Sequence, residues 1–191
     1  MELDPADRDA AYRALTSVLA PRPIGWISTV DAAGVGNLAP FSFFNAVSSR
    51  PPAVAFSPGD RDGTLKDTPR NALDTGEFVV NLATEDLIED VDRTSVDAAG
   101  SEFDLAGLER EPSLVVGPPR VAESPAVLEC TVLDSVRVGD AATTRVGTGV
   151  RPKRGRPTGS PGGRVATGPR SRADARPPSG DRLPATASLL C

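Results

Sequence analysis

Two short stretches hold the residues best suited to chemistry, and the first of them is Lys66–Thr68. Asp67 or Thr68 can cap the start of a helix, where unpaired N–H groups and the positive end of the helix dipole favour an anion. Lys66 adds an ammonium group within the same turn. This stretch could therefore hold a phosphate of about two negative charges. An ordinary surface helix with a solvated lysine fits the same pattern.

The second stretch, Asn37–Asn45, mixes aromatic and small polar side chains. Its phenylalanines are Phe41, Phe43 and Phe44, and its polar side chains include Asn37, Ser42 and Asn45. Apolar planes beside hydrogen-bonding groups suit a flat, amphipathic ligand. A hairpin that packs only against its own core is the competing interpretation.

The chain contains no histidine, which excludes a Ser-His-Asp triad, a histidine-based metal site and imidazole acid–base chemistry. Its two cysteines, Cys130 and Cys191, have no metal-ligand spacing and make no disulfide framework. Cys130 falls on the apolar face of a predicted strand, so we interpret it as a small core residue and not as a nucleophile. We predict no metal site, and any chemistry should belong to a cofactor.

Four motifs in order resemble the flavin reductase-like family. They are Pro21–Thr29, Asn37–Asn45, Lys66–Thr68 and Glu77–Leu82, within a likeness that runs from about Tyr12 to Asp140. The resemblance implies a mainly β fold with short helices, the FMN-binding split β-barrel, and a homodimer. Further strands should close such a barrel after Asp140, and none is visible in the sequence. The predicted barrel is therefore incomplete at its C-terminal end.

The resemblance also implies where FMN would bind. The isoalloxazine ring would lie against the corner from Asn37 to Ser42, and Ser57, Lys66 and Thr68 would hold the phosphate. The implied cofactor-binding residues are Thr29, Asn37, Leu38, Ala39, Pro40, Phe41, Ser42, Asn45, Ser57, Lys66, Asp67 and Thr68. Arg22 and Thr29 are weaker candidates, because either side chain could be purely structural.

The implied reaction passes reducing equivalents from NADH or NADPH through FMN to free flavin or another acceptor. No catalytic side chain is required, because the protein would contribute orientation and electrostatics. The sequence has no G-x-G-x-x-G fingerprint, so no Rossmann domain is expected. Two alternatives remain open: an FMN-binding carrier without turnover, and a truncated, inactive member of the family.

Hydrophobic periodicity predicts the elements that position these stretches. Helices are expected over 9–19, 67–76 and 84–92, with a further helix and loop over 94–108. Strands are expected on both sides of a turn at 31–34, and over 53–57, 77–82, 115–116, 120–121 and 124–139. The first helix should pack across a barrel mouth or a dimer seam. Phe103 is either a lid over the flavin or, as we favour, a buried anchor.

Charge divides the chain into two parts. Residues 1–140 carry 24 acidic and 11 basic side chains, and arginine supplies 10 of those 11. This balance suits a cytoplasm of high ionic strength and makes nucleic acid an unsuitable partner. The sequence has no apolar run that could span a membrane and no basic leader, so we expect a cytoplasmic protein.

Residues 141–191 differ from the rest. They carry 2 acidic and 10 basic side chains, with eight glycines, seven prolines and no aromatic residue. Such a composition cannot bury enough surface to offset its ordering entropy, so we expect a disordered tail beyond a domain of residues 1–140. It is either a genuine basic tail or, as we favour, the product of a lost reading frame. The nucleotide sequence after codon 140 decides between the two.

Overall fold

A computed structural model describes residues 4, 6–59, 64–96, 100–138 and 142–148. The helices are α1 (Arg8–Val18), α2 (Asp67–Thr75), a 3₁₀ turn (Glu85–Leu87), α3 (Ile88–Arg93) and α4 (Glu102–Ala106). The strands are β1 (Gly25–Val30), β2 (Gly36–Phe41), β3 (Phe44–Ser49), β4 (Pro52–Phe56), β5 (Glu77–Leu82), β6 (Arg110–Glu111), β7 (Arg120–Val121), β8 (Val127–Val138) and β9 (Ala142–Thr148). The predicted mainly β fold with short helices is confirmed.

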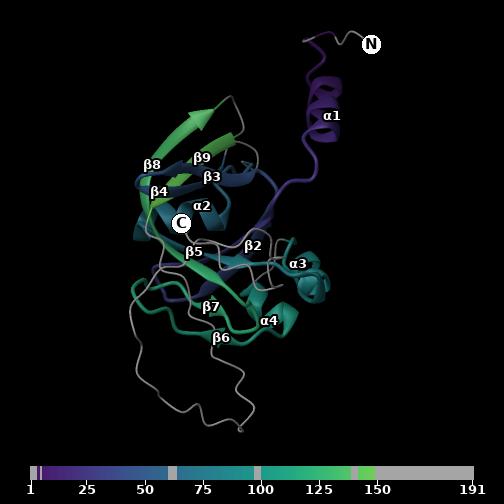
Figure 1. Ribbon diagram of the computed structural model, residues 1–191. Coiled ribbons are helices and arrows are strands. Elements are labelled where there is room, and N and C mark those ends of the chain that lie inside the picture. Colours follow the sequence, from purple (N-terminus) through teal and green to yellow (C-terminus); the bar gives the residue numbers. More distant parts are fainter. Residues whose placement is uncertain (1–3, 5, 60–63, 97–99, 139–141, 149–191) are drawn as a thin grey trace, which may run out of the picture.

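Seven strands form one antiparallel sheet in the order β2-β1-β5-β8-β9-β4-β3 (Figure 1). The long strand β8 joins its two halves, because its first part pairs with β5 and its second part with β9. The register of β8 shifts between Val132 and Asp134, and such a bulge bends a strand. The sheet therefore folds around one interior, with β2 and β3 as its two edges.

The hairpin β1–β2 forms as the sequence predicts. The Asp31 carboxylate accepts hydrogen bonds from the backbone N–H groups of Ala33 and Val35, at 2.9 and 2.8 Å. Gly34 adopts a φ of 84°, which an L side chain rarely takes. These contacts fix the register in which Trp26 lies opposite Pro40 and Thr29 opposite Asn37. The turn thus sets which side chains of the second stretch share a face.

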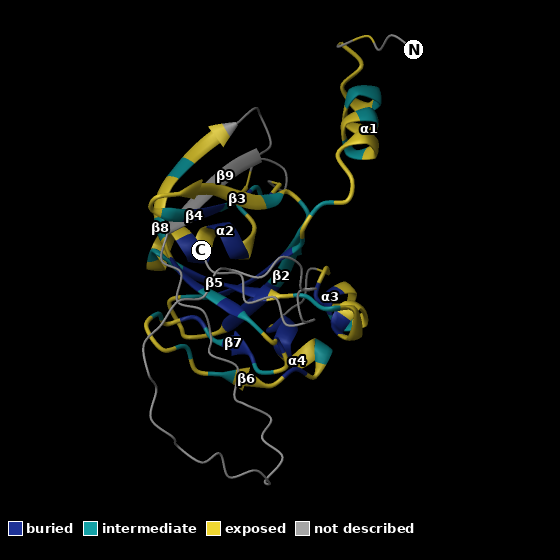
Figure 2. Ribbon diagram, viewed as in Figure 1, coloured by how far each residue is buried: buried dark blue, intermediate teal, exposed yellow. Residues whose placement is uncertain are grey.

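Alternation along β1 sends its side chains to two separate cores. Ile27 points into the interior of the sheet, where the cluster consists of Ile27, Val54, Phe56, Ala72, Phe78, Val80 and Cys130. Ala72 belongs to α2, and the buried side of this helix closes the interior (Figure 2). The Phe56 and Phe78 rings meet edge to face, with centroids 5.2 Å apart.

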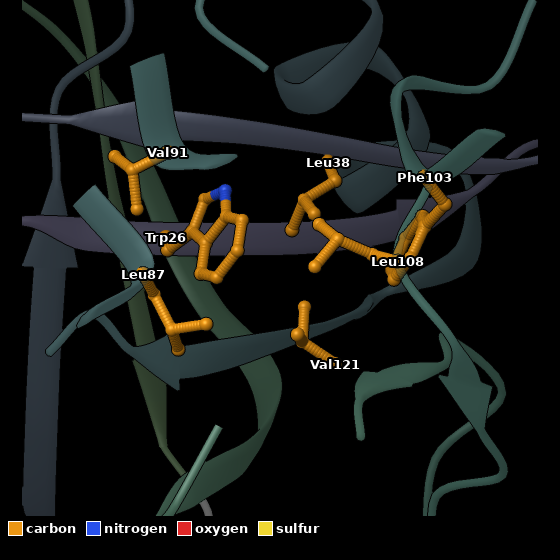
Figure 3. Close-up of a cluster of buried hydrophobic side chains, with 7 residues drawn as sticks. All are labelled: Trp26, Leu38, Leu87, Val91, Phe103, Leu108 and Val121. Atoms are coloured by element: carbon orange, nitrogen blue, oxygen red, sulfur yellow. The ribbon is translucent and has the colours of Figure 1, made fainter. Parts of the chain in front are cut away.

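Trp26 points to the opposite face of the sheet, into a second core. This cluster consists of Trp26, Leu38, Leu87, Val91, Phe103, Leu108 and Val121 (Figure 3). The Trp26 indole N–H donates to the Thr94 hydroxyl at 2.8 Å, so its one polar atom is satisfied. Phe103 is fully buried, which confirms the interpretation of this residue as an anchor.

Three local features differ from the predictions. The helix and loop expected over 94–108 are replaced by a short helix, α4, between Gly100 and Gly107, which both have positive φ. Val115–Val116 form a bend and not a strand, because the buried Glu129 carboxylate accepts the backbone N–H groups of Leu114 and Val115. After the bend at Ser42 and Phe43 the chain forms a further strand, β3, that was not predicted.

Helix α1 forms as predicted, but none of its residues is buried and it extends from the body of the molecule (Figure 1). Its Tyr12 ring stacks on Phe43 with centroids 6.4 Å apart. At the other end of the chain, β9 lies beyond residue 140 and pairs with both β8 and β4. The described fold therefore extends past the predicted end of the domain. The rest of the predicted tail, 149–191, lies outside the described residues.

Candidate functional site

The bend between β2 and β3 lies between two cavities, and Ser42 on this bend lines both of them. The first, which we call the α3 cavity, has a volume of about 690 Å³. The second, which we call the Arg22 cavity, has a volume of about 530 Å³. Both volumes fall within the range of small-molecule sites. The bend is part of the second stretch that the sequence singled out.

The α3 cavity combines an apolar floor with a charged wall. Ile24, Pro40 and Val91 supply apolar surface, and α3 contributes charged side chains at one side. The charged side chains that line it are Glu89, Asp92 and Arg93. A flat, uncharged ring could lie on such a floor.

The Arg22 cavity lies between the segment after α1 and the strands β3 and β4. Its polar lining includes Ser42, Asn45 and Ser57, three of the predicted cofactor-binding residues. The Arg22 guanidinium donates through Nη1 to the backbone carbonyls of Thr16 and Leu19, at 3.0 and 2.9 Å. These bonds hold the guanidinium against the end of α1.

The Arg22 guanidinium also lies over the Phe43 ring, 5.5 Å from its centroid. Its Nε atom is buried and has no hydrogen-bond partner among the described residues. A buried donor without an acceptor is costly, so this atom is an exception to the usual pairing of buried polar groups.

A second group of predicted residues forms a buried polar chain instead. The Asn37 amide donates to the Thr68 hydroxyl at 2.8 Å, and the Asn71 amide donates to the Thr29 hydroxyl at 3.4 Å. The exposed fractions of Thr29, Asn37 and Thr68 are 0%, 9% and 3%. These bonds attach α2 to the hairpin, so the start of α2 and the start of β2 lie side by side. Neither cavity includes any of these side chains.

The helix start itself differs from the prediction. Lys66, and not Asp67 or Thr68, occupies the N-cap position of α2, and its side chain makes no capping hydrogen bond. Asp67 is the first helical residue and forms an ion pair with Arg70. The Thr68 hydroxyl accepts its hydrogen bond from the Asn37 amide instead. Lys66 and Asp67 are exposed and line neither cavity.

The remaining predicted residues divide between the cores and the bend. Leu38 belongs to the Trp26 cluster, and Phe41 packs against the interior cluster. Ala39 is half-buried and lines neither cavity, whereas Pro40 lines the α3 cavity. Only the end of the second stretch is therefore open to a ligand in the two cavities.

A match to a known domain decides the family. The model of the flavin reductase like domain matches residues 18–151, which is more than half of the chain. The chain belongs to the flavin reductase-like family. The matched range includes strand β9, which the sequence analysis placed outside the domain.

Relatives and solved structures support the same assignment. An uncharacterized protein of Aquifex aeolicus is 43% identical over 137 residues, which cover 70% of either chain. Nitrilotriacetate monooxygenase component B from Bacillus cereus is 31% identical with a TM-score of 0.75, over 82% of this chain and 86% of the other. The 2-nitrobenzoate 2-nitroreductase of Pseudomonas fluorescens is 25% identical with a TM-score of 0.73, over 80% and 75%. The split-barrel fold is confirmed, and at the level of the family the chain is related to flavin-dependent oxidoreductases.

Sequence reasoning missed two residues of this flavin reductase-like domain, Glu102 and Ser101, that bind the backbone of β2. The Glu102 carboxylate accepts the backbone N–H of Leu38 at 3.0 Å, and the neighbouring Ser101 hydroxyl donates to the carbonyl of Gly36. Burial raises the pKa of Glu102, the Leu38 N–H lowers it in part, and the Asp67 carboxylate raises it again. The pair covers the outer edge of β2. No local signal reveals it, because Glu102 lies far along the chain from β2.

The described residues hold no reactive thiol in either cavity. Cys130 is buried, and desolvation with the nearby Glu129 carboxylate raises its pKa to about 12. The prediction of a core cysteine is confirmed. Among the described residues there is no cluster of three or more His, Cys, Asp or Glu side chains that could hold a metal ion. None of the described helices is long and apolar enough to span a membrane.

Proposed function

We propose that this protein is a flavin-dependent oxidoreductase that binds FMN across the bend at Ser42. The observation that carries the proposal is the pair of cavities that share this residue. FMN has two unlike ends, a flat and largely apolar ring and an anionic phosphate. Both cavities combine apolar surface with a guanidinium, but Arg93 shares the α3 cavity with Glu89 and Asp92, whereas no carboxylate of a described residue lines the Arg22 cavity.

The ring is proposed to lie in the α3 cavity. Pro40 and Ile24 would contact its apolar surface, and the Ser42 hydroxyl would bond to a polar atom at its edge. Glu102 and Ser101 act indirectly here, because they bind the backbone of β2, the strand that precedes the bend in the chain. Rigid support of this kind keeps a bound ring in one orientation.

The phosphate is proposed to lie in the Arg22 cavity. The Arg22 guanidinium, the Ser57 hydroxyl and the Asn45 amide could bond to its oxygens. The start of α2, with Lys66, Asp67 and Thr68, is the other candidate for this role, as the family resemblance suggests. If the Arg22 cavity holds the phosphate, removal of the Arg22 charge should weaken FMN binding. If the start of α2 holds it, removal of the Lys66 charge should do so.

A bound flavin would take reducing equivalents from NADH or NADPH and pass them to free flavin or another acceptor. The side chains of this chain would bind and orient the two molecules and keep water away from the apolar floor of the α3 cavity. No titratable side chain is assigned a proton transfer. The chain contains no histidine, so no imidazole is present to transfer a proton.

Purification of the chain with its flavin tests the proposal. We expect FMN to copurify in a ratio near one per chain, and we expect oxidation of NADH or NADPH when an acceptor is added. Bound FMN without oxidation would instead favour the carrier function. A chain that binds no added FMN would contradict the proposal and would leave the truncated, inactive alternative.

We further propose a cytoplasmic homodimer adapted to high ionic strength. Helix α1 supports the dimer, because its apolar residues Tyr12, Leu15 and Val18 are exposed. Light scattering should give twice the mass of the chain. Unfolding that becomes easier as salt is raised from low to molar concentration would contradict the adaptation to salt.

A further inference from the structure

The segment that contains α3 supplies most of the lining of the α3 cavity. Its lining residues are Ile88, Glu89, Val91, Asp92, Arg93 and Ser95. The rest of the lining comes from Ile24, just before β1, and from Pro40 and Ser42 at the bend. The shape of the cavity therefore depends on where α3 lies relative to β1 and β2.

Helix α3 has little that holds it in this position by itself. It contains six residues, and a helix this short is marginal unless other elements pack against it. Its N-cap residue, Leu87, makes no side-chain capping hydrogen bond. Its ion pairs, from Arg93 to Glu89 and Asp90, join residues of the helix to one another. They do not attach the helix to the sheet.

A buried chain of two hydrogen bonds attaches the end of α3 to β1. Thr94 is the C-cap residue of α3 and is fully buried. Its hydroxyl accepts from the Trp26 indole N–H at 2.8 Å and donates to the Val91 carbonyl at 2.9 Å. In the part of the chain that the structure describes, the Trp26–Thr94 bond is the one hydrogen bond that joins residues 84–95 to any other segment.

Val91 lies between this bond and the cavity. Its side chain packs in the Trp26 cluster and also lines the α3 cavity (Figure 3). Ile24 packs against the same cluster and lines the same cavity. A hydrogen bond is directional, so it fixes the placement of the helix end more narrowly than apolar packing does. A shift of α3 away from Trp26 would therefore change the apolar floor of the cavity.

We propose that Thr94 is a positioning residue of the flavin site, which holds α3 against β1 so that the α3 cavity keeps the shape that the ring requires. The inference rests on the proposed function, because that function places the ring in this cavity. Thr94 does not line the cavity, so it acts through α3. Without the Thr94 hydroxyl the buried indole N–H has no acceptor, and α3 can relieve this cost by moving away from Trp26.

Thr94→Val tests the inference, because it keeps the branched shape of the side chain and removes the hydroxyl. Hydrogen exchange measured by mass spectrometry should show about a tenfold loss of protection in α3, with β8 unchanged. Fluorescence titration should show riboflavin and FMN both binding about fivefold more weakly, the factor that corresponds to one hydrogen bond. The two flavins should lose the same factor, because they share the ring and differ at the phosphate.

Three further variants separate positioning from a general loss of stability. Thr94→Ser keeps the hydroxyl and should restore both the exchange of α3 and the flavin affinities. Trp26→Phe removes the same bond from its other side and should reproduce the effects of Thr94→Val. Ser28→Ala is the matched control, because it removes another fully buried hydroxyl of β1, which donates to the Pro119 carbonyl at 2.6 Å and lines neither cavity. It should leave α3 and flavin binding as in the wild type.

The two readouts distinguish failure of this inference from failure of the proposed function. Wild-type exchange of α3 in Thr94→Val would overturn the inference whatever the flavin affinities are. Faster exchange with wild-type affinity for riboflavin would also overturn it, because α3 would then not position the ring, and the proposed function would stand. A wild type that binds neither riboflavin nor FMN would overturn the proposed function and the positioning role together.

Discussion

The predicted site residues fall into two regions of similar chemistry and different burial. Thr29, Asn37 and Thr68 belong to the buried polar chain, where hydrogen bonds attach α2 to the hairpin. Ser42, Asn45 and Ser57 lie at the open bend and line cavities. Both regions consist of small hydroxyl and amide side chains. The difference shows that residue type indicates polar contact, whereas exposure decides whether the contact is with the protein or with a ligand.

The two regions would support the proposed flavin in different ways. The buried polar chain fixes the position of α2, and Glu102 fixes β2, so these residues act on the site through the backbone. The open bend offers free surface to a ligand. Substitutions in the first region should change stability more than binding, and substitutions in the second should do the reverse.

The largest expected effect is on stability, from Asn37→Leu. This change leaves the buried Thr68 hydroxyl without its donor, which should lower the free energy of unfolding by about 2 kcal/mol. Ser42→Ala at the bend should change it by less than about 0.5 kcal/mol. Urea denaturation of both variants measures the difference. An Asn37 variant of normal stability that fails to bind FMN would show that Asn37 contacts the cofactor directly.

The next largest effect is on binding, from Arg22→Gln. Loss of a charge-assisted hydrogen bond should weaken FMN binding by about 1.5 kcal/mol, or roughly tenfold. Riboflavin lacks the phosphate, so its affinity should change by less than about twofold. Fluorescence titration with both flavins measures the two effects, and Lys66→Gln is the matched comparison. The opposite pattern, with Lys66 essential and Arg22 dispensable, would move the phosphate to the start of α2.

A smaller effect concerns the pH dependence of stability, through Glu102. Its pKa is raised above the ordinary value of 4.5, so the folded state favours the protonated form. The corresponding stability is fully present below about pH 4.5 and is lost as pH rises through the folded pKa. Glu102→Gln keeps an acceptor for Leu38 and removes this titration. The variant should therefore gain stability relative to the wild type as pH rises above 4.5.

Denaturation of the two proteins across that pH range measures the gain. If the difference in stability between the two proteins did not change with pH, the protonation of Glu102 would not be linked to folding in this range. A large loss of stability in the variant at neutral pH would mean that the charge itself is required at the edge of β2.

The smallest effect is expected at Cys130, which serves as a reference for the buried region. With Cys191→Ser as background, Cys130 is the single thiol, and its pKa of about 12 leaves almost no thiolate at pH 8. An alkylating reagent should modify it only after unfolding in urea. Rapid modification of the folded protein, measured by mass spectrometry, would show that the interior cluster opens.

Local features of the sequence predicted much of this fold. The turn at Asp31–Gly34, the helix α2 that ends at Gly76 and the alternation around Cys130 all follow from short-range rules. Strand β3 was missed because its residues are mostly exposed on both faces and show no alternation. The bend at 114–118 was missed because Glu129, more than ten residues away, binds its backbone.

The site was predicted in part for the same reason. Ser42 and Asn45 were singled out by the composition of their stretch and Ser57 by the family resemblance, and the structure brings the three together at one cavity. Glu102 was not found, because its role depends on a contact between α4 and β2 that the sequence does not place. The burial of Thr29, Asn37 and Thr68 was not predicted, because exposure cannot be derived from residue type.

The central claim is that FMN crosses the bend at Ser42, and a bulky side chain there tests it most directly. Titration of FMN, followed by flavin fluorescence, compares the wild type with Ser42→Tyr and with Ser49→Tyr on the exposed strand β3. We predict that the wild type and Ser49→Tyr bind FMN alike, and that Ser42→Tyr binds at least roughly tenfold more weakly. Wild-type affinity in Ser42→Tyr would contradict the claim.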